Sequence, residues 1–255
     1  MEKAIAVVSG KGGTGKTSFV SNVGAALHHM GFDVTVVDAD VTTSNLGLSL
    51  GMFQLPLGLQ DVLRGDIDIE DSIYRHPFGL KVIPSSLSFK YIQSSVSLNR
   101  FKNLIKKLGG LVIIDSPPGI GKDVTSIMKA SDEIIVITNP QITAVTDSFK
   151  AVMLAKELGI DSVSIVVNRI RGKHEMTKQE IESMCEAPVI GEVPEDPWVD
   201  RSLFEKVPII YNKPLSPAAL AYTKIAHTLT GMEYKPPRFL RVKRLLGLSH
   251  LYSGL

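Results

Sequence analysis

The sequence predicts a three-layer α/β fold in which helices cover both faces of a mostly parallel central sheet. Short runs of apolar, β-prone residues alternate along the chain with segments whose apolar residues recur at helical spacing. The apolar runs are continuous, which is typical of strands that are buried on both faces. This alternation of strand and helix favours parallel strands joined by helical crossovers.

Length and composition are those of an ordinary globular protein with one large α/β domain. The chain has 255 residues, of which 44% are hydrophobic and 21% are charged. Its apolar runs are all shorter than the roughly 20 residues that span a bilayer. The single cysteine, Cys185, excludes an internal disulfide and a cysteine-only metal site within this chain. We expect no secretory signal, because the first strand begins by residue 4.

Residues 4–17, AIAVVSGKGGTGKT, form the stretch with the clearest chemistry. Gly10, Gly15, Lys16 and Thr17 make the pattern G-x-x-x-x-G-K-T between a strand and a helix, which is a phosphate-binding loop. Glycines let backbone N–H groups turn towards phosphate oxygens. Lys16 would supply a charge for the β- and γ-phosphates, and Thr17 a hydroxyl ligand for Mg²⁺. The loop residues expected to bind the nucleotide are Gly10, Lys11, Gly12, Gly13, Thr14, Gly15, Lys16, Thr17 and Ser18.

The same glycines also fit a second pattern. Gly10, Gly12 and Gly15 spell G-x-G-x-x-G, the fingerprint of dinucleotide-binding proteins. That interpretation leaves Lys16 and Thr17 without a role. We therefore favour a nucleoside triphosphate.

The elements after the loop continue the pattern. Residues 18–30 are predicted to form a helix that ends at Gly31. A strand at 34–37 follows, which we expect to lie beside the first strand, and it runs into carboxylates at Asp38 and Asp40. Side chains at this end of a strand point into the crevice where open α/β sheets bind ligands. An aspartate can also cap the following loop or helix, which would account for one of the two.

A second acidic strand end appears at Asp115. The intervening chain is predicted to contain loops and short helices at 42–75, a strand at 80–83 and an amphipathic helix at 98–108. Residues 111–114 are four apolar residues directly before the aspartate, as in a Walker B strand. We expect this acid to hold Mg²⁺, usually through water.

The turn after Asp115 bears on hydrolysis. Ser116 stands where many ATPases place a glutamate that activates water, and a hydroxyl cannot do that work. The carboxylate available to orient water is therefore Asp40. The rigid Pro-Pro-Gly turn that follows would bring the Gly119 N–H near the γ-phosphate, where it could sense hydrolysis.

The late strand ends are expected to recognise the base. Predicted strands are 133–138, 162–168 and 189–193, and predicted helices are 144–158, 178–184 and 217–230. An asparagine amide can pair with the edge of adenine, and a proline can pack on its face. The candidate residues are Asn168, Arg169, Pro194, Glu195 and Asp196. A plain loop asparagine and a turn proline are the alternative.

The C-terminal segment differs in charge from the rest. We expect one domain over residues 1–231, a linker at 232–237 and a basic amphipathic helix at 238–255. The net charge is +2, and residues 234–255 carry five basic and no acidic residues, which leaves residues 1–233 at −3. An acidic body argues against nucleic-acid binding by the body as a whole.

The tail itself predicts a membrane contact. Its apolar and basic residues fall largely on opposite faces of a helix, as in helices that lie on an anionic membrane surface. The apolar face holds Phe239, Val242, Leu245 and Leu246, and the opposite face Arg241 and Arg244. One copy would bind weakly and two in a dimer much better. The alternatives are a helix docked on the domain and a disordered or nucleic-acid-binding tail.

Several motifs together resemble one family. The segments KGGTGKT, DADVTTSNLGLSLG, LVIIDSPPGI, TNP, VVNR and VPEDP occur in the order and spacing of MinD-type ATPases of the MinD/ParA family, most like the archaeal ones. A lysine directly after the first loop glycine, here Lys11, is typical of their deviant phosphate loop. Without the family, Lys11 would be interpreted as a solvated loop lysine.

The resemblance implies a P-loop NTPase fold, ATP and Mg²⁺ as cofactors, and slow ATP hydrolysis stimulated by a partner. It implies a homodimer in the ATP state, with Lys11 acting across the interface. The implied catalytic residues are Lys11, Lys16 and Asp40, and the implied magnesium shell is Thr17, Asp38 and Asp115.

The resemblance also implies a place in the cell. Residues 238–252 would bind the anionic inner face of the cell membrane, so that a cytoplasmic protein becomes peripheral there. Such ATPases position a division site, a pole or an organelle through an activating or cargo protein that this sequence does not identify. A ParA-like partitioning ATPase and a MinD-type flagellar-number regulator are the alternatives.

Overall fold

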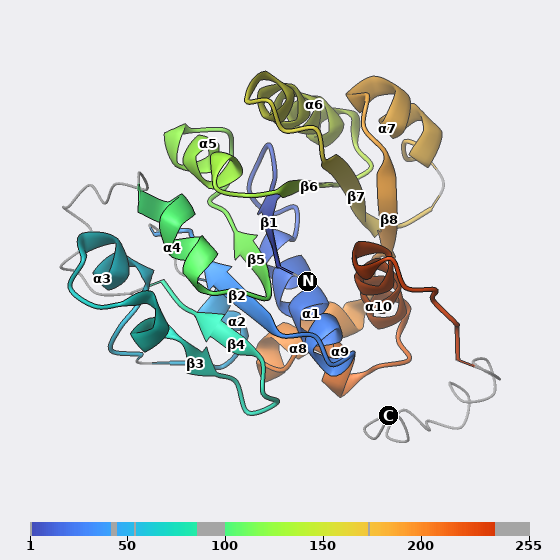
Figure 1. The fold of residues 1–255 in the computed structure, drawn as a ribbon. Helices are drawn as coiled ribbons and strands as arrows, with labels where there is room; N and C mark the ends of the chain where they lie inside the picture. Colours follow the sequence, from blue (N-terminus) through green and yellow to red (C-terminus); the bar gives the residue numbers. More distant parts are fainter. Residues whose placement is uncertain (1, 42–44, 54, 86–99, 173, 238–255) are drawn as a thin grey trace.

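The computed structural model describes residues 2–41, 45–53, 55–85, 100–172 and 174–237. Figure 1 shows a central sheet with helices on both faces, so the predicted three-layer α/β architecture is confirmed. The strands are β1 (Lys3–Val8), β2 (Val34–Asp38), β3 (Tyr74–Arg75), β4 (Lys81–Ile83), β5 (Leu111–Asp115), β6 (Glu133–Thr138), β7 (Val163–Ile170) and β8 (Val189–Pro194).

The strands form one sheet in the order β3-β4-β2-β5-β1-β6-β7-β8. Every pairing is parallel except that between β3 and β4 at one edge. The strand at 34–37 was expected beside the first strand, and this prediction is wrong because β5 lies between β1 and β2. A short apolar run fits any interior position of a sheet, so its pattern does not specify its neighbours.

Helices cover the two faces in separate groups. The helices are α1 (Lys16–His29), α2 (Leu46–Ser49), α3 (Leu59–Arg64), α4 (Phe101–Lys107), α5 (Lys122–Lys129), α6 (Ile142–Glu157), α7 (Lys178–Cys185), α8 (Pro197–Glu205), α9 (Ile209–Asn212) and α10 (Pro217–Thr230), with a 3₁₀ turn, η1 (Ile69–Ser72). One core contains residues of α3 to α7, and the other contains residues of α1, α2, α9 and α10 (Figure 1). Successive residues of β1 alternate between the cores, with Ala4, Ala6 and Val8 in one and Ile5 and Val7 in the other.

Most predicted helices and strands are present, with ends that shift by one to three residues. The helix 217–230 is observed at the predicted residues, whereas the helix predicted from 98 begins at Phe101. Residues 98 and 99 of that prediction lie outside the described residues. The sequence patterns did not predict helices α5, α8 and α9. Of these, α8 had a usable signal, because Asp196 caps it and Pro197 occupies its first turn.

Other expectations concern the ends of the chain and the cysteine. Cys185 is buried, and burial raises the pKa of its thiol, as suits an inert core residue. Among the described residues, no helix has both the length and the apolar character needed to cross a bilayer. The division into 1–231, 232–237 and 238–255 stays a prediction, since the C-terminal segment lies outside the described residues.

Candidate nucleotide site

The predicted phosphate loop connects β1 to the first turn of α1, at the carboxyl edge of the sheet. At two of its glycines, neighbouring atoms leave no room for a side chain. Gly15 has φ of +98°, and a Cβ there would lie 2.2 Å from Nδ2 of Asn168. Gly10 has no positive φ, but a Cβ there would lie 2.4 Å from Cβ of Asp147 in α6. The loop is therefore enclosed by α6 on one side and by the end of β7 on another.

Lys16 is directed into the protein and is only 8% exposed. Its Nζ donates a hydrogen bond of 2.9 Å to Oγ of Ser9, and that hydroxyl in turn donates to the carbonyl of Lys11 at 2.8 Å. Burial lowers the pKa of Lys16, while the negative charges of Asp115 and Asp40 oppose this effect. A phosphate would meet a lysine that is already oriented.

The predicted magnesium residues lie together. Asp38 and Asp115 are paired in register on β2 and β5, which brings the two carboxylates side by side. Oγ1 of Thr17 donates to Oδ2 of Asp115 at 2.6 Å. The other oxygen of Asp115, Oδ1, is buried without a hydrogen-bond partner. The oxygens of Asp38 accept from the backbone N–H groups of Asp40 and Leu46, both at 3.2 Å.

The electrostatics of this cluster suit a cation. Burial raises the pKa of Asp115 to about 6, against the opposing hydrogen bond from Thr17 and the charge of Lys16. Burial also raises the pKa of Asp38, and the neighbouring Asp115 adds to the effect. No group of three or more His, Cys, Asp or Glu side chains in the described ranges is arranged to hold a metal. Mg²⁺ commonly takes one or two protein carboxylates together with phosphates and waters, so the residues present fit it.

The candidate catalytic carboxylate, Asp40, is 7% exposed and close enough to affect the pKa values of Lys16, Asp38 and Asp115. Ser116, the residue that replaces the usual glutamate, is buried, and its hydroxyl donates to the carbonyl of Pro117 at 3.1 Å. Asp40 therefore lies beside both the phosphate lysine and the expected magnesium ligands.

Gly119 was expected to offer its N–H to a γ-phosphate. In the structure this N–H donates to the carbonyl of Ser9 at 3.1 Å, and Gly119 has φ of +89°. The contact joins the turn after β5 to the start of the phosphate loop. A phosphate would have to take the place of the Ser9 carbonyl to receive this N–H.

Lys11 is half-buried, and it makes no ion pair with any residue in the described part of the chain. It is flanked on the loop by the exposed Gly12 and Gly13. Its backbone is fixed, because its carbonyl accepts the Ser9 hydroxyl. A lysine with a fixed backbone and an uncommitted side chain remains available to a further anion.

A hollow beside the loop collects the residues predicted to recognise the base. Its lining includes Asn168, Arg169, Pro194, Glu195 and Asp196, together with Gly15, Ser18, Val199, Asp200 and Tyr222. Segments at the ends of β7 and β8 thus meet the start of α1, as expected for strand ends on one edge. Tyr222, on α10, was missed because it occupies an apolar position of a helix and resembles a core residue.

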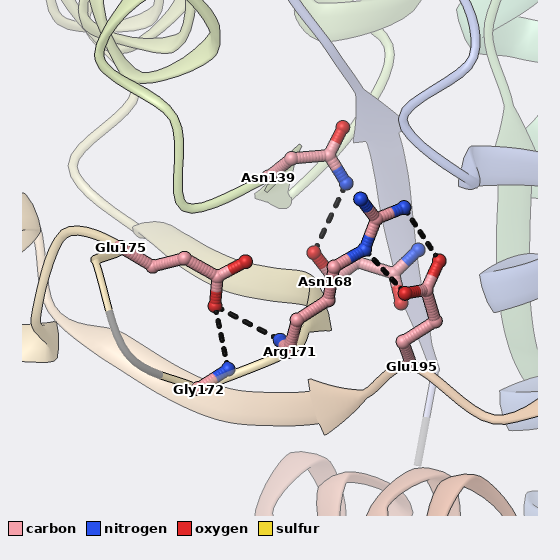
Figure 2. A network of polar contacts seen from close by, with 6 residues as sticks. All are labelled: Asn139, Asn168, Arg171, Gly172, Glu175 and Glu195. Atoms are coloured by element: carbon pink, nitrogen blue, oxygen red, sulfur yellow. Dashed lines mark hydrogen bonds and ion pairs between the residues drawn. The ribbon is translucent and has the colours of Figure 1, made fainter.

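Asn168 ties the hollow to the loop. Its side-chain Nδ2 donates to the backbone carbonyl of Thr14 at 2.8 Å. The backbone carbonyl of Asn168 accepts from Nδ2 of Asn139 at 3.0 Å (Figure 2). Asp196 is engaged differently: its carboxylate accepts from the N–H groups of Trp198 and Ala218, at 3.0 and 3.1 Å. These bonds give Asp196 a structural role as a cap shared by two helices.

Glu195 has a partner that sequence reasoning missed. The Arg171 guanidinium makes a bidentate ion pair with it: Nε donates to Oε2, and Nη2 donates to Oε1 at 2.8 Å. Figure 2 shows this pair and Glu175, whose carboxylate accepts from the N–H groups of Arg171 and Gly172 at 2.9 and 3.0 Å. The pair lies at the rim of the hollow, where both side chains are exposed. No spacing rule predicts it, because Arg171 follows β7 and Glu195 follows β8, 24 residues further along the chain.

Comparison with known proteins agrees with this geometry. The model of the CobQ/CobB/MinD/ParA nucleotide binding domain matches residues 5–209. An uncharacterised ATP-binding protein of Methanocaldococcus jannaschii is 39% identical over 258 residues, which cover 100% of this chain and 97% of that protein. The septum site-determining protein MinD of Synechocystis is 30% identical and covers 91% of each chain.

Solved structures point the same way. The cell division ATPase MinD of Pyrococcus furiosus has a TM-score of 0.85 and 33% identity, covering 91% of this chain and 99% of the other. MinD of Pyrococcus horikoshii, complexed with Mg-ADP, has a TM-score of 0.84 and 33% identity, covering 90% and 96%. The prediction of a P-loop NTPase fold is confirmed. The chain therefore belongs to the CobQ/CobB/MinD/ParA family of nucleotide-binding proteins, in which MinD proteins are among its relatives.

Proposed function

We propose that this protein binds ATP with Mg²⁺, hydrolyses it slowly and acts as a MinD-like spatial regulator. The observation that carries the proposal is the cluster around Lys16, where a buried lysine, the Thr17–Asp115 pair and Asp40 meet at the phosphate loop. The M. jannaschii relative is described as ATP-binding, and the P. horikoshii relative contains Mg-ADP. Both descriptions suit this arrangement of donors and carboxylates.

The protein groups have separate tasks in hydrolysis. Lys16 exchanges its bond to Ser9 for phosphate oxygens and stabilises the charge that develops on them. Thr17, Asp38 and Asp115 would hold Mg²⁺, which would supply positive charge to neutralise the phosphates. Asp40 orients the attacking water, because Ser116 has no carboxylate to do so. Without the usual glutamate, turnover is expected to be slow until a partner protein improves this alignment.

A second copy of the chain is the expected partner in the ATP state. Ile120 and Ile142 are large apolar residues that are 41% and 58% exposed. They follow β5 and β6, the two strands that flank β1 and its phosphate loop. Apolar side chains at one exposed edge of the sheet can form part of an interface between two copies. A dimer across this face would bury them and bring Lys11 of each copy to the partner's nucleotide.

The dimer would bind an anionic membrane through residues 238–252, which lie outside the described residues. Each basic residue near such a surface contributes about 1 kcal/mol, and two tails in one dimer bind far better than one. ATP would thus place the protein on the membrane and hydrolysis would release it. The process that it positions, in cell division or at a pole or organelle, depends on an activating or cargo protein of unknown identity.

The alternative of a ParA-like protein that binds DNA is disfavoured by the net charge of −3 in residues 1–233. A flagellar-number regulator would use the same site and the same tail, so it differs only in its partner.

Co-sedimentation separates the DNA-binding alternative from our proposal. We expect the protein to pellet with anionic vesicles in ATP but not in ADP or without nucleotide. Pelleting with DNA, and with vesicles in no condition, would refute the membrane proposal.

A further inference from the structure

Helices α1, α9 and α10 pack against one another (Figure 1). A second hollow lies among them, beside Phe78 in the turn between β3 and β4. We call it the α10 groove. Its lining is mainly aromatic and aliphatic, and it includes Phe78, Tyr211, Leu215, Leu220, His227 and Tyr234. It shares no lining residue with the hollow at the base-binding end of the nucleotide site.

The groove exposes apolar surface that a folded protein usually covers. Phe78 stacks on Tyr211 with ring centroids 4.2 Å apart, yet Phe78 remains 45% exposed. Tyr211 is anchored below, because its hydroxyl donates to the carbonyl of Ala25 at 3.3 Å. Phe78 and Tyr211 therefore give the groove an apolar wall, which is the character of a docking surface, beside polar lining residues that include His28, His29 and Lys235.

The chain itself supplies an occupant. Tyr234, Lys235 and Pro237 line the groove, so the segment that begins at residue 238 starts at its rim. Four residues of that segment, Phe239, Val242, Leu245 and Leu246, form an apolar face on a helical wheel. Covalent attachment keeps this face at a high effective concentration near the groove. No carboxylate lines the groove among the described residues, so the basic face of the tail would remain in water.

We propose that residues 238–255 dock in the α10 groove through this apolar face whenever the protein is not on a membrane. The inference rests on the proposed use of the tail as a membrane anchor, because the same apolar face serves both contacts. Docking and membrane binding then exclude each other. The groove covers the apolar face of the tail and keeps it from water until a membrane competes for that face.

Two of the helices that form the groove, α1 and α10, also reach the nucleotide site. Helix α1 begins at Lys16 in the phosphate loop and ends at His28 and His29, which line the groove. Helix α10 carries Tyr222 in the base hollow and Leu220 in the groove. A shift of either helix on nucleotide binding would therefore alter the groove directly.

Hydrogen exchange on the full chain tests docking without a membrane or nucleotide. In the double variant Phe239→Ser/Leu245→Ser, amides around Phe78 and in α9 should exchange several-fold faster than in the wild type, because the tail no longer covers them. The matched control, Arg241→Ser/Arg244→Ser, removes basic residues instead and should leave this exchange unchanged. Equal exchange in the wild type and the apolar-face variant would overturn the proposal.

Vesicle binding by variants of the groove gives a second test of docking. Phe78→Ser changes a partly exposed side chain in the turn between β3 and β4, and Leu220→Asp changes one on α10. If most wild-type tails are docked, both variants should bind phosphatidylglycerol–phosphatidylcholine vesicles more tightly, by about tenfold where nine tails in ten are docked. Unchanged vesicle binding in both variants would refute docking. If no form of the protein binds vesicles, the anchoring proposal fails, and the exchange experiment still decides whether the tail occupies the groove.

Discussion

The contact between Gly15 and Asn168 makes a quantitative prediction. A Cβ at position 15 would lie 2.2 Å from Nδ2 of Asn168, which now donates to the carbonyl of Thr14. Gly15→Ala therefore imposes two costs. The φ of +98° costs an alanine about 1–2 kcal/mol. Displacement of the amide loses a buried hydrogen bond, which costs about 1 kcal/mol more.

Gly13→Ala is the matched control. Gly13 has φ of +78°, but no atom lies within 4 Å of the Cβ that an alanine would add. This variant carries the backbone strain alone, about 1–2 kcal/mol. The difference between the two variants in free energy of unfolding should therefore be about 1 kcal/mol, the share of the Asn168 contact.

Urea denaturation of the nucleotide-free protein measures both costs, and calorimetric titration with ADP measures the effect on the loop. A double-mutant cycle with Asn168→Ala isolates the contact, because Gly15→Ala should be less harmful once the amide is gone. Equal destabilisation by Gly13→Ala and Gly15→Ala, or strict additivity with Asn168→Ala, would refute the reasoning.

Three further predictions concern the loop and its carboxylates. Lys16→Ala should abolish ATP binding, measured by titration, and retained affinity would contradict the phosphate-loop assignment. Asp40→Ala should stop turnover while ATP still drives dimerisation, as seen by phosphate release and light scattering; unchanged turnover would place the water-orienting role elsewhere. Asp115→Asn should stabilise the nucleotide-free protein by about 1–3 kcal/mol at pH 7 while weakening Mg²⁺-dependent nucleotide binding. Burial raises the pKa of Asp115 to about 6, so the charged carboxylate destabilises the folded wild type above that pH. The stabilisation by Asp115→Asn should therefore be complete above about pH 6 and should disappear as the pH falls towards about 4. A stability gain that grows on acidification would contradict the sign.

Sequence patterns were informative where one residue type is forced by local chemistry. The phosphate loop and the strand-end aspartates were found because glycine, lysine and carboxylate have specific local roles there. Patterns could not show that β5 separates β1 from β2, since apolar strands are interchangeable by composition. Yet this order brings Asp38 and Asp115 together. The closeness of the two carboxylates was thus a property of sheet topology and not of spacing.

Residues that act through long-range contacts were the ones missed. Arg171, directly after β7, meets Glu195, directly after β8, and Tyr222 reaches the base hollow from a helix that packs on α1. Such contacts depend on how elements pack, and a single sequence does not encode them as a local pattern. Asp196 shows the opposite case. An acid directly before Pro197 is a local signal for a helix cap, but from the sequence we assigned Asp196 to base recognition, and the structure contains the cap.

Ser9 connects the parts of the site that ATP is expected to change. Its hydroxyl accepts from Lys16 and donates to the carbonyl of Lys11, and its carbonyl accepts from the N–H of Gly119. These three donors are thus satisfied within the protein, whereas Oγ1 of Thr14 in the same loop is buried without a hydrogen-bond partner. A triphosphate that draws Lys16 and Gly119 to its oxygens would break two contacts of Ser9 at once. The loop that presents Lys11 and the turn that presents Ile120 would then rearrange together, which couples phosphate binding to the face proposed for dimerisation.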